Sequence, residues 1–480
     1  MPPRDSLVPV PTTGPLVPWL RELRATAALA GPIVATQLGE IAIHVTDVLM
    51  LARVDTAALA AGTLGADVFI FFLLFAIGVV QAVQPLTAQA EGAGDLEGVR
   101  RTVRQGLWMA FAVALPLIAL LSLTPWMLAL LGQNPATAEA ASGYMGAARW
   151  GLPGAAVFMV LRSLVSALSR PGLALLVMWG GVGVNVLLNR VFIFGALGVP
   201  AYGVTGAGIA SALVNTAMAL ALLAVVLRVP RLRAYRILDR LLAPDWARFA
   251  AIARMGFPIA ATLLCEVGIF TAATLMMGTM GEVPLAAHGI AIQVAATTFM
   301  VPLGIGLAAT VRVGLAQGAR DPQGVRRAGW TAFALAGIVM AAASVVLLSA
   351  PDALIGLFRD PADPANAAVV EVARMLLLVA AGFQLVDGAQ VVGQNVLRGL
   401  SDVRVPFAIA LTGYWGVGIL AAWALAFPLA LGPVGVWLGL AAGLAAVAGL
   451  LLARFHRRER LGLVRHPSEH DEAGSQRCGR

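Results

Sequence analysis

The sequence has little charge of either sign, no lysine and few cysteines. Of its 480 residues, 12% are charged and 59% are hydrophobic, and the mean hydropathy is +0.86. Soluble domains carry about a quarter charged residues, so this composition excludes an ordinary soluble enzyme or binding domain. Apolar runs of about 20 residues, the length that spans a bilayer as a helix, recur along the whole chain. We therefore expect an all-α polytopic membrane protein.

The scarcity of cysteine and of catalytic motifs narrows the function further. Cys265 lies in an apolar run and Cys478 in the polar tail, so no disulfide framework is expected. The chain contains no P-loop, GxSxG, HExxH or CxxC motif, which argues against nucleotide-dependent, hydrolytic and metal-dependent enzymes. We expect no enzyme and no bound cofactor.

The formal net charge of +8 would suggest nucleic-acid binding in a soluble protein, but the basic residues are not spread evenly. They gather in alternate loops, including 100–104, 231–248 and 320–327, and in the tail. Arg53 and Arg359 are the exceptions in the intervening loops. Cytoplasmic loops carry this excess of arginine. We therefore expect both termini in the cytoplasm, a multi-pass protein of the plasma (inner) membrane, and no nucleic-acid partner.

Polar breaks between the apolar runs predict twelve spans. Their approximate limits are 27–51, 57–82, 103–123, 139–168, 173–195, 206–228, 256–280, 285–316, 328–350, 367–398, 405–427 and 433–454. The longest polar interruption, 229–255, is expected to lie along the cytoplasmic membrane surface as a basic linker. The predicted parts of the chain are a cytoplasmic N-terminal segment (1–26), an N-lobe (27–228), the linker, a C-lobe (256–455) and a cytoplasmic tail (456–480).

The two halves resemble each other at a constant separation. Pro32 aligns with Pro258, and GDLEGVRR at 94–101 aligns with RDPQGVRR at 320–327, in both cases 226 residues later. Each half has an even number of spans. This predicts two parallel six-helix repeats about an axis along the membrane normal, enclosing a central cleft, which is the architecture of a carrier.

Acidic residues lie inside the predicted spans. Glu40 and Asp47 are in the first span, Glu266 in the seventh and Asp387 in the tenth. A carboxylate in hydrocarbon costs several kcal/mol unless it is protonated, paired or bound to an ion. At the repeat separation Glu40 and Glu266 are equivalent, whereas Asp47 falls on Ala273. The symmetric frame therefore carries an asymmetric set of charges.

Two amide side chains in the fifth span, Asn185 and Asn189, lie one turn apart and suit an acidic neighbour. We predict two cation-handling sites. One contains Asp47 with the two asparagines, and the other contains Glu266 with Asp387. The alternative is that these polar groups only join helices.

His44 lies one turn from both Glu40 and Asp47, so it either relays a proton or neutralises Glu40. His288 is expected at the external membrane interface. Methionine, aromatic and polar side chains near the cleft suit a promiscuous site for lipophilic cations, although ordinary helix packing explains many of them. The predicted cleft residues are Phe69, Met276, Met277, Met280, Gln384 and Tyr414.

Five stretches run in order from the first span to the tenth: VTDVLMLARVDTAALAA, QPLTAQAEGAG, GFPIAATLLCEVGIF, PLAAHGIAIQVAATTFMVPLGIGLAATVRVG and GFQLVDGAQVVGQNVLRGLSD. Together they resemble the multidrug and toxic compound extrusion (MATE) family, in particular its NorM branch. The resemblance implies two six-helix lobes, alternating access, and export of cationic drugs in exchange for Na⁺ or H⁺. We expect a monomer whose partners are the bilayer and small cationic, drug-like molecules.

The resemblance also assigns positions. Asp47 resembles the first-helix acid of the N-lobe, and Pro32 the proline at which that helix bends in some members. Glu266 and Asp387 resemble the cation-site pair of the C-lobe, which implies Na⁺ at these two acids. Phe383 stands one turn before Asp387, where sodium-coupled relatives often have a tyrosine, and this weakens the expectation of an intact sodium shell.

Other functions stay open at this point. A lipid-linked precursor flippase of the wider superfamily would favour a basic cleft, for which Arg162 and Arg190 are the intramembrane candidates. An intramembrane enzyme or a channel is the alternative from another class. Glu40 stands where a neutral amide is more usual in the family, which favours proton handling in the N-lobe.

Overall fold

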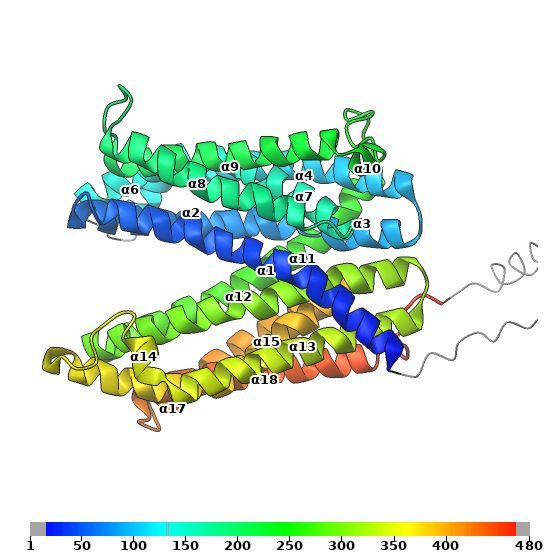
Figure 1. The fold of residues 1–480 in the computed structure, drawn as a ribbon. Helices are drawn as coiled ribbons and strands as arrows, with labels where there is room; N and C mark the ends of the chain where they lie inside the picture. The colour runs from blue at the N-terminus through cyan, green and yellow to red at the C-terminus, as the bar shows by residue number, and fades with distance from the viewer. Residues whose placement is uncertain (1–15, 131, 133, 467–480) are drawn as a thin grey trace, which may run out of the picture.

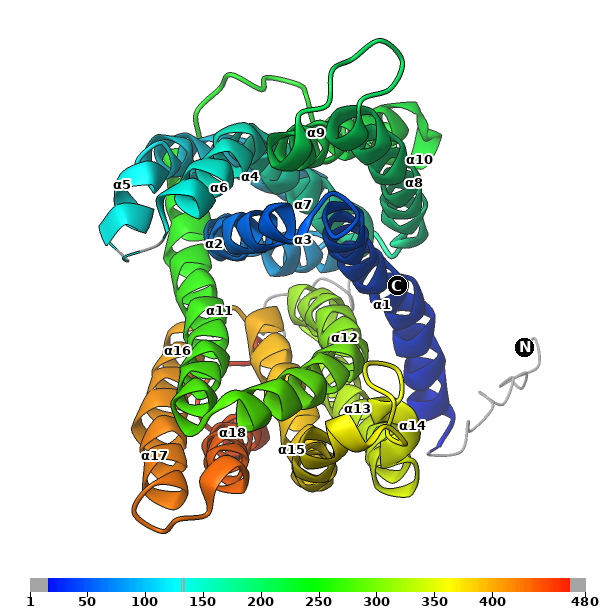
Figure 2. The same ribbon diagram turned by 90° about the vertical axis from the view of Figure 1, so that its left-hand side faces the viewer.

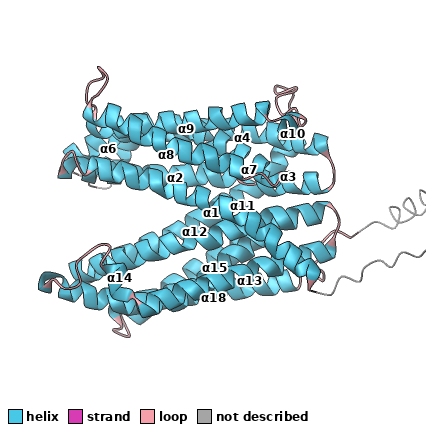
Figure 3. Ribbon diagram, in the orientation of Figure 1, coloured by secondary structure: helices cyan, strands magenta, loops and turns pink. Residues whose placement is uncertain are grey.

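The computed structural model describes residues 16–130, 132 and 134–466, and the regular elements of this part of the chain are helices (Figure 3). Within it, twelve helical segments are long and apolar enough to cross a membrane. Each coincides with one predicted span, so the protein is a multi-pass membrane protein as expected. The outer parts of the predicted N-terminal segment and tail, 1–15 and 467–480, lie outside the described residues.

The N-lobe consists of the helices that precede the linker. They are α1 (Val17–Leu51), α2 (Thr56–Val80), α3 (Val83–Gly92), α4 (Leu96–Leu121), α5 (Thr124–Leu130), α6 (Pro135–Ala148), η1 (Arg149–Gly151), α7 (Leu152–Ala167), α8 (Gly172–Phe194) and α9 (Gly203–Arg228). Two pairs, α2 with α3 and α6 with α7, each form one crossing of the membrane.

The linker contains one short helix, α10 (Pro230–Arg233), and the C-lobe follows it. Its elements are α11 (Trp246–Met280), α12 (Glu282–Gly318), α13 (Pro322–Ser349), α14 (Pro351–Ile355), η2 (Pro364–Asn366), α15 (Ala367–Gly399), α16 (Arg404–Leu411), η3 (Thr412–Ile419), α17 (Leu420–Ala426) and α18 (Gly432–His456). The segment η3 is a π-helix within the crossing formed by α16 and α17.

Several helices begin earlier than the apolar pattern predicts. The first helix begins at Val17 instead of 27, and α11 begins at Trp246 instead of 256. These added turns contain arginine, so the apolar pattern marks only the part of each helix that suits the hydrocarbon. The helical backbone hydrogen bonds extend beyond that part. The rest of the linker packs against the N-lobe, where Trp108 Nε1 donates to the Leu241 carbonyl at 2.8 Å.

The repeat is visible in local details of the backbone. Asp95 and Asp321, 226 residues apart, cap α4 and α13, and each accepts a hydrogen bond of 2.8 Å from the backbone N–H three residues later. Pro32 and Pro258 both lie inside their helices, and in both cases the threonine four residues later donates to the proline carbonyl at 2.8 Å. Proline and threonine in this arrangement weaken and bend helices, so the predicted bend at Pro32 stays a prediction with local support.

The two lobes form separate layers that meet at one end of the molecule (Figure 1). The start of α1 and the end of α18 both lie at that end, and the layers diverge away from it. Two helices cross between the layers (Figure 2). The helix α1 packs against α12 of the C-lobe and α8 of the N-lobe, and α11 packs against α2 of the N-lobe and η3 of the C-lobe.

Reciprocal glycine contacts hold the lobes together where they meet. A Cβ atom at Gly92 would lie 2.0 Å from the Leu315 carbonyl oxygen, and a Cβ atom at Gly318 would lie 2.0 Å from the Gln89 carbonyl oxygen. The two contacts are related by the repeat separation, so α3 and α12 approach each other across the predicted symmetry axis. Only glycine permits so close an approach of two backbones.

Candidate functional site

The N-lobe brings Asp47 together with both predicted asparagines. Oδ1 of Asp47 accepts hydrogen bonds from Asn185 Nδ2 at 3.0 Å and Asn189 Nδ2 at 2.5 Å, and Oδ2 accepts from Ser211 Oγ at 3.1 Å. Asp47 is 8% exposed, and the two asparagines are fully buried. These donors come from α8 and α9, and all of them are neutral. The carboxylate is therefore solvated by dipoles, without a cationic partner among the hydrogen bonds of the described residues.

One oxygen in this cluster lacks a partner. Oδ1 of Asn189 is buried and has no hydrogen bond among the described residues, while its Nδ2 also lies 3.2 Å from Asn185 Oδ1. Buried polar atoms are almost always paired. A buried carboxylate beside an unpaired carbonyl oxygen is an arrangement that a proton or a small cation completes.

His44 and Asp67 adjoin this cluster. His44 is exposed, and it lies near enough to Asp47 and Asp67 to interact with them electrostatically. Asp67 lies within α2 and was not among the predicted site residues. The sequence contains the evidence for it, because Asp67 is an acid inside an apolar stretch, GADVFIF, just as Asp47 is an acid inside the apolar first span.

Glu40 takes a different partner from the one that its spacing predicts. Its carboxylate forms an ion pair with Arg162 of α7. The predicted neutralisation of Glu40 by His44 is therefore wrong, because a cationic guanidinium from another helix occupies that place. Helical spacing predicts partners within α1, but it cannot predict a partner that comes from α7.

The C-lobe brings Glu266 of α11 together with Asp387 of α15. Gln390 Nε2 bridges them, at 3.0 Å from Glu266 Oε1 and 3.4 Å from Asp387 Oδ1. Asp387 is 4% exposed, and Glu266 is half-buried. The predicted pairing of these acids is present as geometry, and the glutamine between them was not anticipated.

Tyr414 adds a hydroxyl to the C-lobe acids. Its OH donates to Gln390 Oε1 at 2.7 Å and accepts from Gln394 Nε2 at 2.9 Å. Phe383 stands where sodium-coupled relatives often have a tyrosine, and it packs edge-on against Phe270 and Trp437. A phenol from the π-helix η3 thus reaches the network from a different helix. Such π-helical turns are frequent at functional sites.

A polar ladder extends from this site along α15. Asp387, Gln390, Gln394 and Arg398 follow at spacings of three, four and four, and each is at most 5% exposed. Arg398 NH2 donates to Gln394 Oε1 at 3.2 Å, and its NH1 donates to Oε1 of Gln81 in the N-lobe at 3.1 Å. Arg398 also interacts electrostatically with Glu266. The ladder therefore connects the C-lobe acids to the contact between the lobes.

Most of the predicted cleft residues lie inside the lobes. Gln384 donates to Thr298 at 2.6 Å, and Met276 and Met280 are partly buried against the C-lobe core. Four of the six are at most 5% exposed, namely Phe69, Met277, Gln384 and Tyr414. Contrary to prediction, these four do not face an open space here, because they pack between helices of one lobe.

His288 was expected at the external membrane interface, and its side chain is buried among the helices of the C-lobe, being 1% exposed. Trp437 Nε1 donates to its Nδ1 at 3.2 Å, and its Nε2 lies 3.0 Å from Thr274 Oγ1. Because an indole N–H only donates, Nδ1 carries no proton and the imidazole is neutral.

A family model described as MatE matches residues 32–191 and 258–424, one stretch in each half of the chain. A protein of Mesorhizobium japonicum named "Probable multidrug resistance protein NorM" is 46% identical over 445 residues, covering 92% of this chain and 95% of that protein. The protein of that name in Brucella suis is 41% identical over 449 residues, covering 93% and 95%.

Solved structures of similar fold exist at lower identity. The eukaryotic MATE transporter AtDTX14 has a TM-score of 0.81 at 20% identity, covering 93% of this chain and all of that one. A multidrug resistance MATE family transporter in an outward-facing conformation has a TM-score of 0.80 at 20% identity, covering 92% and 97%. These likenesses match the two-lobed fold described above.

Proposed function

Because this chain belongs to the MatE family, we propose that it is a secondary active multidrug efflux antiporter. It exports lipophilic, cationic compounds in exchange for Na⁺ or H⁺ by alternating access. Its NorM-named relatives are called multidrug resistance proteins, which supports drug-like substrates.

The observation that carries the exchange mechanism is a buried acid site in each lobe. Asp47 is held by neutral amides and a hydroxyl, and Glu266 and Asp387 are bridged by one glutamine. Such carboxylates in a membrane favour a bound proton or cation. Loading or releasing that ion changes the charge that the surrounding helices must solvate, and antiport requires only that the ion and the substrate prefer different conformations.

Alternating access requires the contacts at the joined end of the lobes to break. The polar contacts that cross there include Arg398 with Gln81, the Gln89 amide with the Gly399 carbonyl at 2.8 Å, and the Glu22–Arg312 ion pair at 2.7 Å. The ladder on α15 ends in the first of them. Ion occupancy at Asp387 is thereby coupled to the interlobe contact through Gln390, Gln394 and Arg398.

The proposal includes the position in the cell. Basic residues concentrate in the loops at the end where α1 begins and α18 ends, which supports cytoplasmic termini in the plasma (inner) membrane. The lobes diverge at the opposite end, so this conformation corresponds to one open toward the outside. We propose a monomer as the working unit, because the two lobes together supply both acid sites.

The alternatives have less support. A flippase for anionic lipid precursors favours a basic cleft, whereas Arg162 is neutralised by Glu40. An enzyme is disfavoured because the family consists of transporters. A channel differs from a carrier in that its flux neither saturates nor depends strictly on a counter-ion gradient.

Efflux of ethidium from proteoliposomes, under a sodium gradient alone and then a pH gradient alone, tests the proposal. We expect saturable efflux under at least one gradient. The variants D47N and D387N are expected to reduce it, and normal efflux by both would contradict the mechanism. Absence of efflux under either gradient would favour the flippase.

A further inference from the structure

Arg104 of α4 is a buried arginine that neither acid site uses. It is 5% exposed, its Nε is buried without a partner, and it forms no hydrogen bond or ion pair with the described residues. A guanidinium carries five N–H donors, and buried polar groups are almost always paired. The acceptor that this guanidinium requires is therefore not among the described residues of the chain.

The residues one turn before and one turn after Arg104 both bind the linker. Arg100 Nε donates to the Tyr235 carbonyl and Trp108 Nε1 donates to the Leu241 carbonyl, each at 2.8 Å. Residues four apart on a helix lie on the same face, so Arg104 lies between two points at which the linker is held against α4. The linker thus packs beside Arg104, although none of its described groups accepts from the guanidinium.

The same face of α4 continues as a lipid-facing stripe. Phe111 and Leu115 follow Trp108 at spacings of three and four, and both are exposed on a helix that is long and apolar enough to cross a membrane. Large apolar side chains exposed on such a helix lie against acyl chains. Arg104 therefore stands directly below this stripe, one turn before Trp108.

The surroundings of Arg104 have the side chains of a membrane surface. Leu242 of the linker is 85% exposed and Trp246, the first residue of α11, is 65% exposed. Trp246 packs edge-on against Trp108, with the ring centroids 6.2 Å apart. Tryptophan gathers at the level of the lipid headgroups, and exposed apolar residues among arginines are typical of segments that lie on a membrane. Arg104 therefore lies at headgroup depth.

The linker adds positive charge to this place. Residues 229–248 contain five arginines and two acids, and each acid already lies beside an arginine, Asp239 beside Arg236 and Asp245 beside Arg101. A phosphate is the acceptor at headgroup depth that matches the fork of a guanidinium. The surplus of positive charge favours a lipid with a net negative charge.

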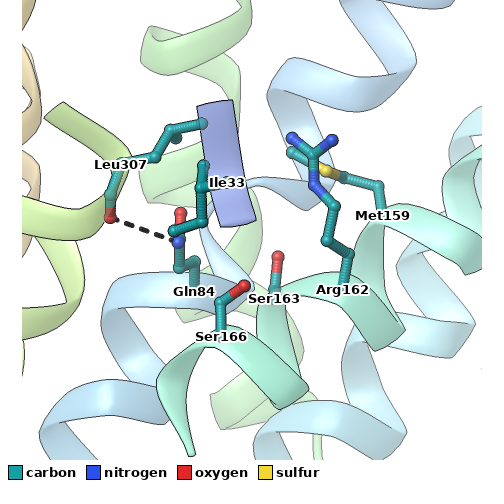
Figure 4. Close-up of a pocket in the computed structure, with 7 residues that line it drawn as sticks. All are labelled: Ile33, Gln84, Met159, Arg162, Ser163, Ser166 and Leu307. Atoms are coloured by element: carbon teal, nitrogen blue, oxygen red, sulfur yellow. Dashed lines mark hydrogen bonds between the residues drawn. The ribbon is translucent and has the colours of Figure 1, made fainter. Parts of the chain in front are cut away.

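Another buried donor without a partner shows the contrast. The Ser163 hydroxyl is also unpaired among the described residues, but it lines a small cavity between α7 and α12 (Figure 4). That cavity has room for about one water molecule, which is enough to satisfy a hydroxyl. Arg104 adjoins a lipid-facing stripe instead, and its guanidinium needs an anion.

We propose that Arg104, together with the linker and the stripe on α4, binds the phosphate of an anionic phospholipid. One acyl chain lies along Phe111 and Leu115, and the phosphate accepts from Arg104 between α4 and the linker. Figure 1 shows α10, the start of the linker, at the same end of the molecule as the start of α1, so the lipid belongs to the leaflet on that side. The bound headgroup completes the contact of α4 with the segment that joins the lobes, and it thereby stabilises the folded protein.

Thermal unfolding of the purified, delipidated full-length protein in detergent tests this inference. Phosphatidylglycerol added in mixed micelles is expected to raise the unfolding temperature of the wild type in a saturable way. Phosphatidylcholine, which carries a phosphate but no net charge, should raise it much less. R104Q is expected to weaken the apparent affinity for phosphatidylglycerol by about tenfold, the value of a charge-assisted hydrogen bond.

Two further variants serve as controls. R231Q removes an exposed arginine of the linker with the same change of charge, and it should respond to phosphatidylglycerol as the wild type does. R104K keeps the charge but loses the fork of donors, so it should weaken the lipid by roughly threefold. This variant keeps the test available if R104Q fails to fold.

The stability without added lipid separates a lipid site from a purely structural arginine. R104Q should then unfold at the same temperature as the wild type or a higher one, because it removes a buried donor group that has no partner. A structural arginine would instead make R104Q less stable in the absence of lipid, and that result would contradict the proposal.

Three other results would overturn the site. Equal stabilisation of R104Q and the wild type by phosphatidylglycerol would show that the lipid binds elsewhere. Equal weakening in R104Q and R231Q would show a general attraction of positive charge and no defined site. If inorganic phosphate alone raises the unfolding temperature as much as phosphatidylglycerol does, the place takes a free anion and the lipid assignment is wrong. None of these measurements depends on transport, so the proposed function stands or fails separately.

Discussion

The two lobes share one helical frame but surround equivalent acids with different partners. Glu40 and Glu266 are related by the repeat, yet Glu40 pairs with Arg162 whereas Glu266 accepts from Gln390 beside Asp387. The close approaches at Gly92 and Gly318 are reciprocal, so the interlobe contact kept its symmetry. Evolution of the repeat thus preserved the backbone packing and changed the polar side chains inside each lobe.

The difference has a consequence for ion chemistry. Asp47 is a single carboxylate among neutral donors, and one proton neutralises it completely. Glu266 and Asp387 are two acids bridged by Gln390, and Arg398 interacts electrostatically with Glu266. A hydrated cation such as Na⁺ needs several oxygen ligands, and the C-lobe site offers carboxylate, amide and phenol oxygens. The lobes are therefore not interchangeable.

The strongest way to break this comparison is to neutralise one acid at a time. We expect D47N to abolish proton-driven efflux of ethidium and D387N to abolish sodium-driven efflux, because each removes the ion-binding charge of its lobe. Vesicles with a single imposed gradient provide the measurement. The control is D352N, which alters an exposed acid and should leave efflux unchanged. Loss of the same drive in both variants would show that the lobes act as one site.

Two of the buried arginines, Arg162 and Arg398, give the next largest contrast. Arg398 is buried and donates charge-assisted hydrogen bonds to Gln394 and Gln81, so R398Q should cost about 2 kcal/mol and lower the thermal stability of the solubilised protein strongly. R162Q should cost about 1 kcal/mol or less, because Glu40 is 42% exposed. Equal losses in R162Q and R398Q would contradict the distinction.

Much of the fold followed from hydropathy and spacing. The twelve spans were predictable because apolar length is nearly sufficient to define a membrane helix. The pairing of Asp47 with Asn185 and Asn189 was predictable because each group has few alternatives in hydrocarbon. What failed at the helix ends was the assumption that a helix stops where the hydrocarbon does.

The missed residues fall into two kinds. The stripe of Gln390, Gln394 and Arg398 was readable, since their spacing from Asp387 places them on one helical face. Tyr414 was predicted as a cleft residue, but its place in the network of the C-lobe acids was not readable, because it depends on the π-helical turn of η3, which shifts side chains relative to an α-helix. Nor does the sequence of one helix reveal that Arg162 meets Glu40.

Removing the Tyr414 hydroxyl should have a smaller effect that is confined to the C-lobe. Y414F keeps the ring and loses hydrogen bonds of 2.7 and 2.9 Å to Gln390 and Gln394. A net loss of about 1 kcal/mol corresponds to roughly fivefold weaker sodium binding, measured by calorimetry on the purified protein. Y144F, in the N-lobe, should not alter sodium binding. A similar loss in both variants would remove the assignment of sodium to the C-lobe.

The smallest effect concerns the segments that follow the sixth span of each lobe. These segments contact equivalent positions of the repeat, Glu91 in the N-lobe and Gln317 in the C-lobe. The Tyr235 hydroxyl donates to Glu91 at 2.8 Å, and the Gln317 amide donates to the Leu463 carbonyl at 2.9 Å. A phenol titrates and an amide does not. The two segments should therefore differ at alkaline pH.

Burial and the hydrogen bond to Glu91 raise the pKa of Tyr235 above its ordinary value of 10.0. A raised pKa means that the folded protein favours the protonated phenol, so its contribution is complete below pH 10.0 and is lost as the pH rises further. Y235F should cost about 1 kcal/mol or less at neutral pH and should abolish this alkaline loss. Q317A should cost a similar amount at every pH. Unfolding temperatures at about pH 8 and about pH 11 measure the difference. An equal alkaline loss of stability in Y235F and the wild type would show that the Tyr235 hydroxyl proton does not stabilise the linker.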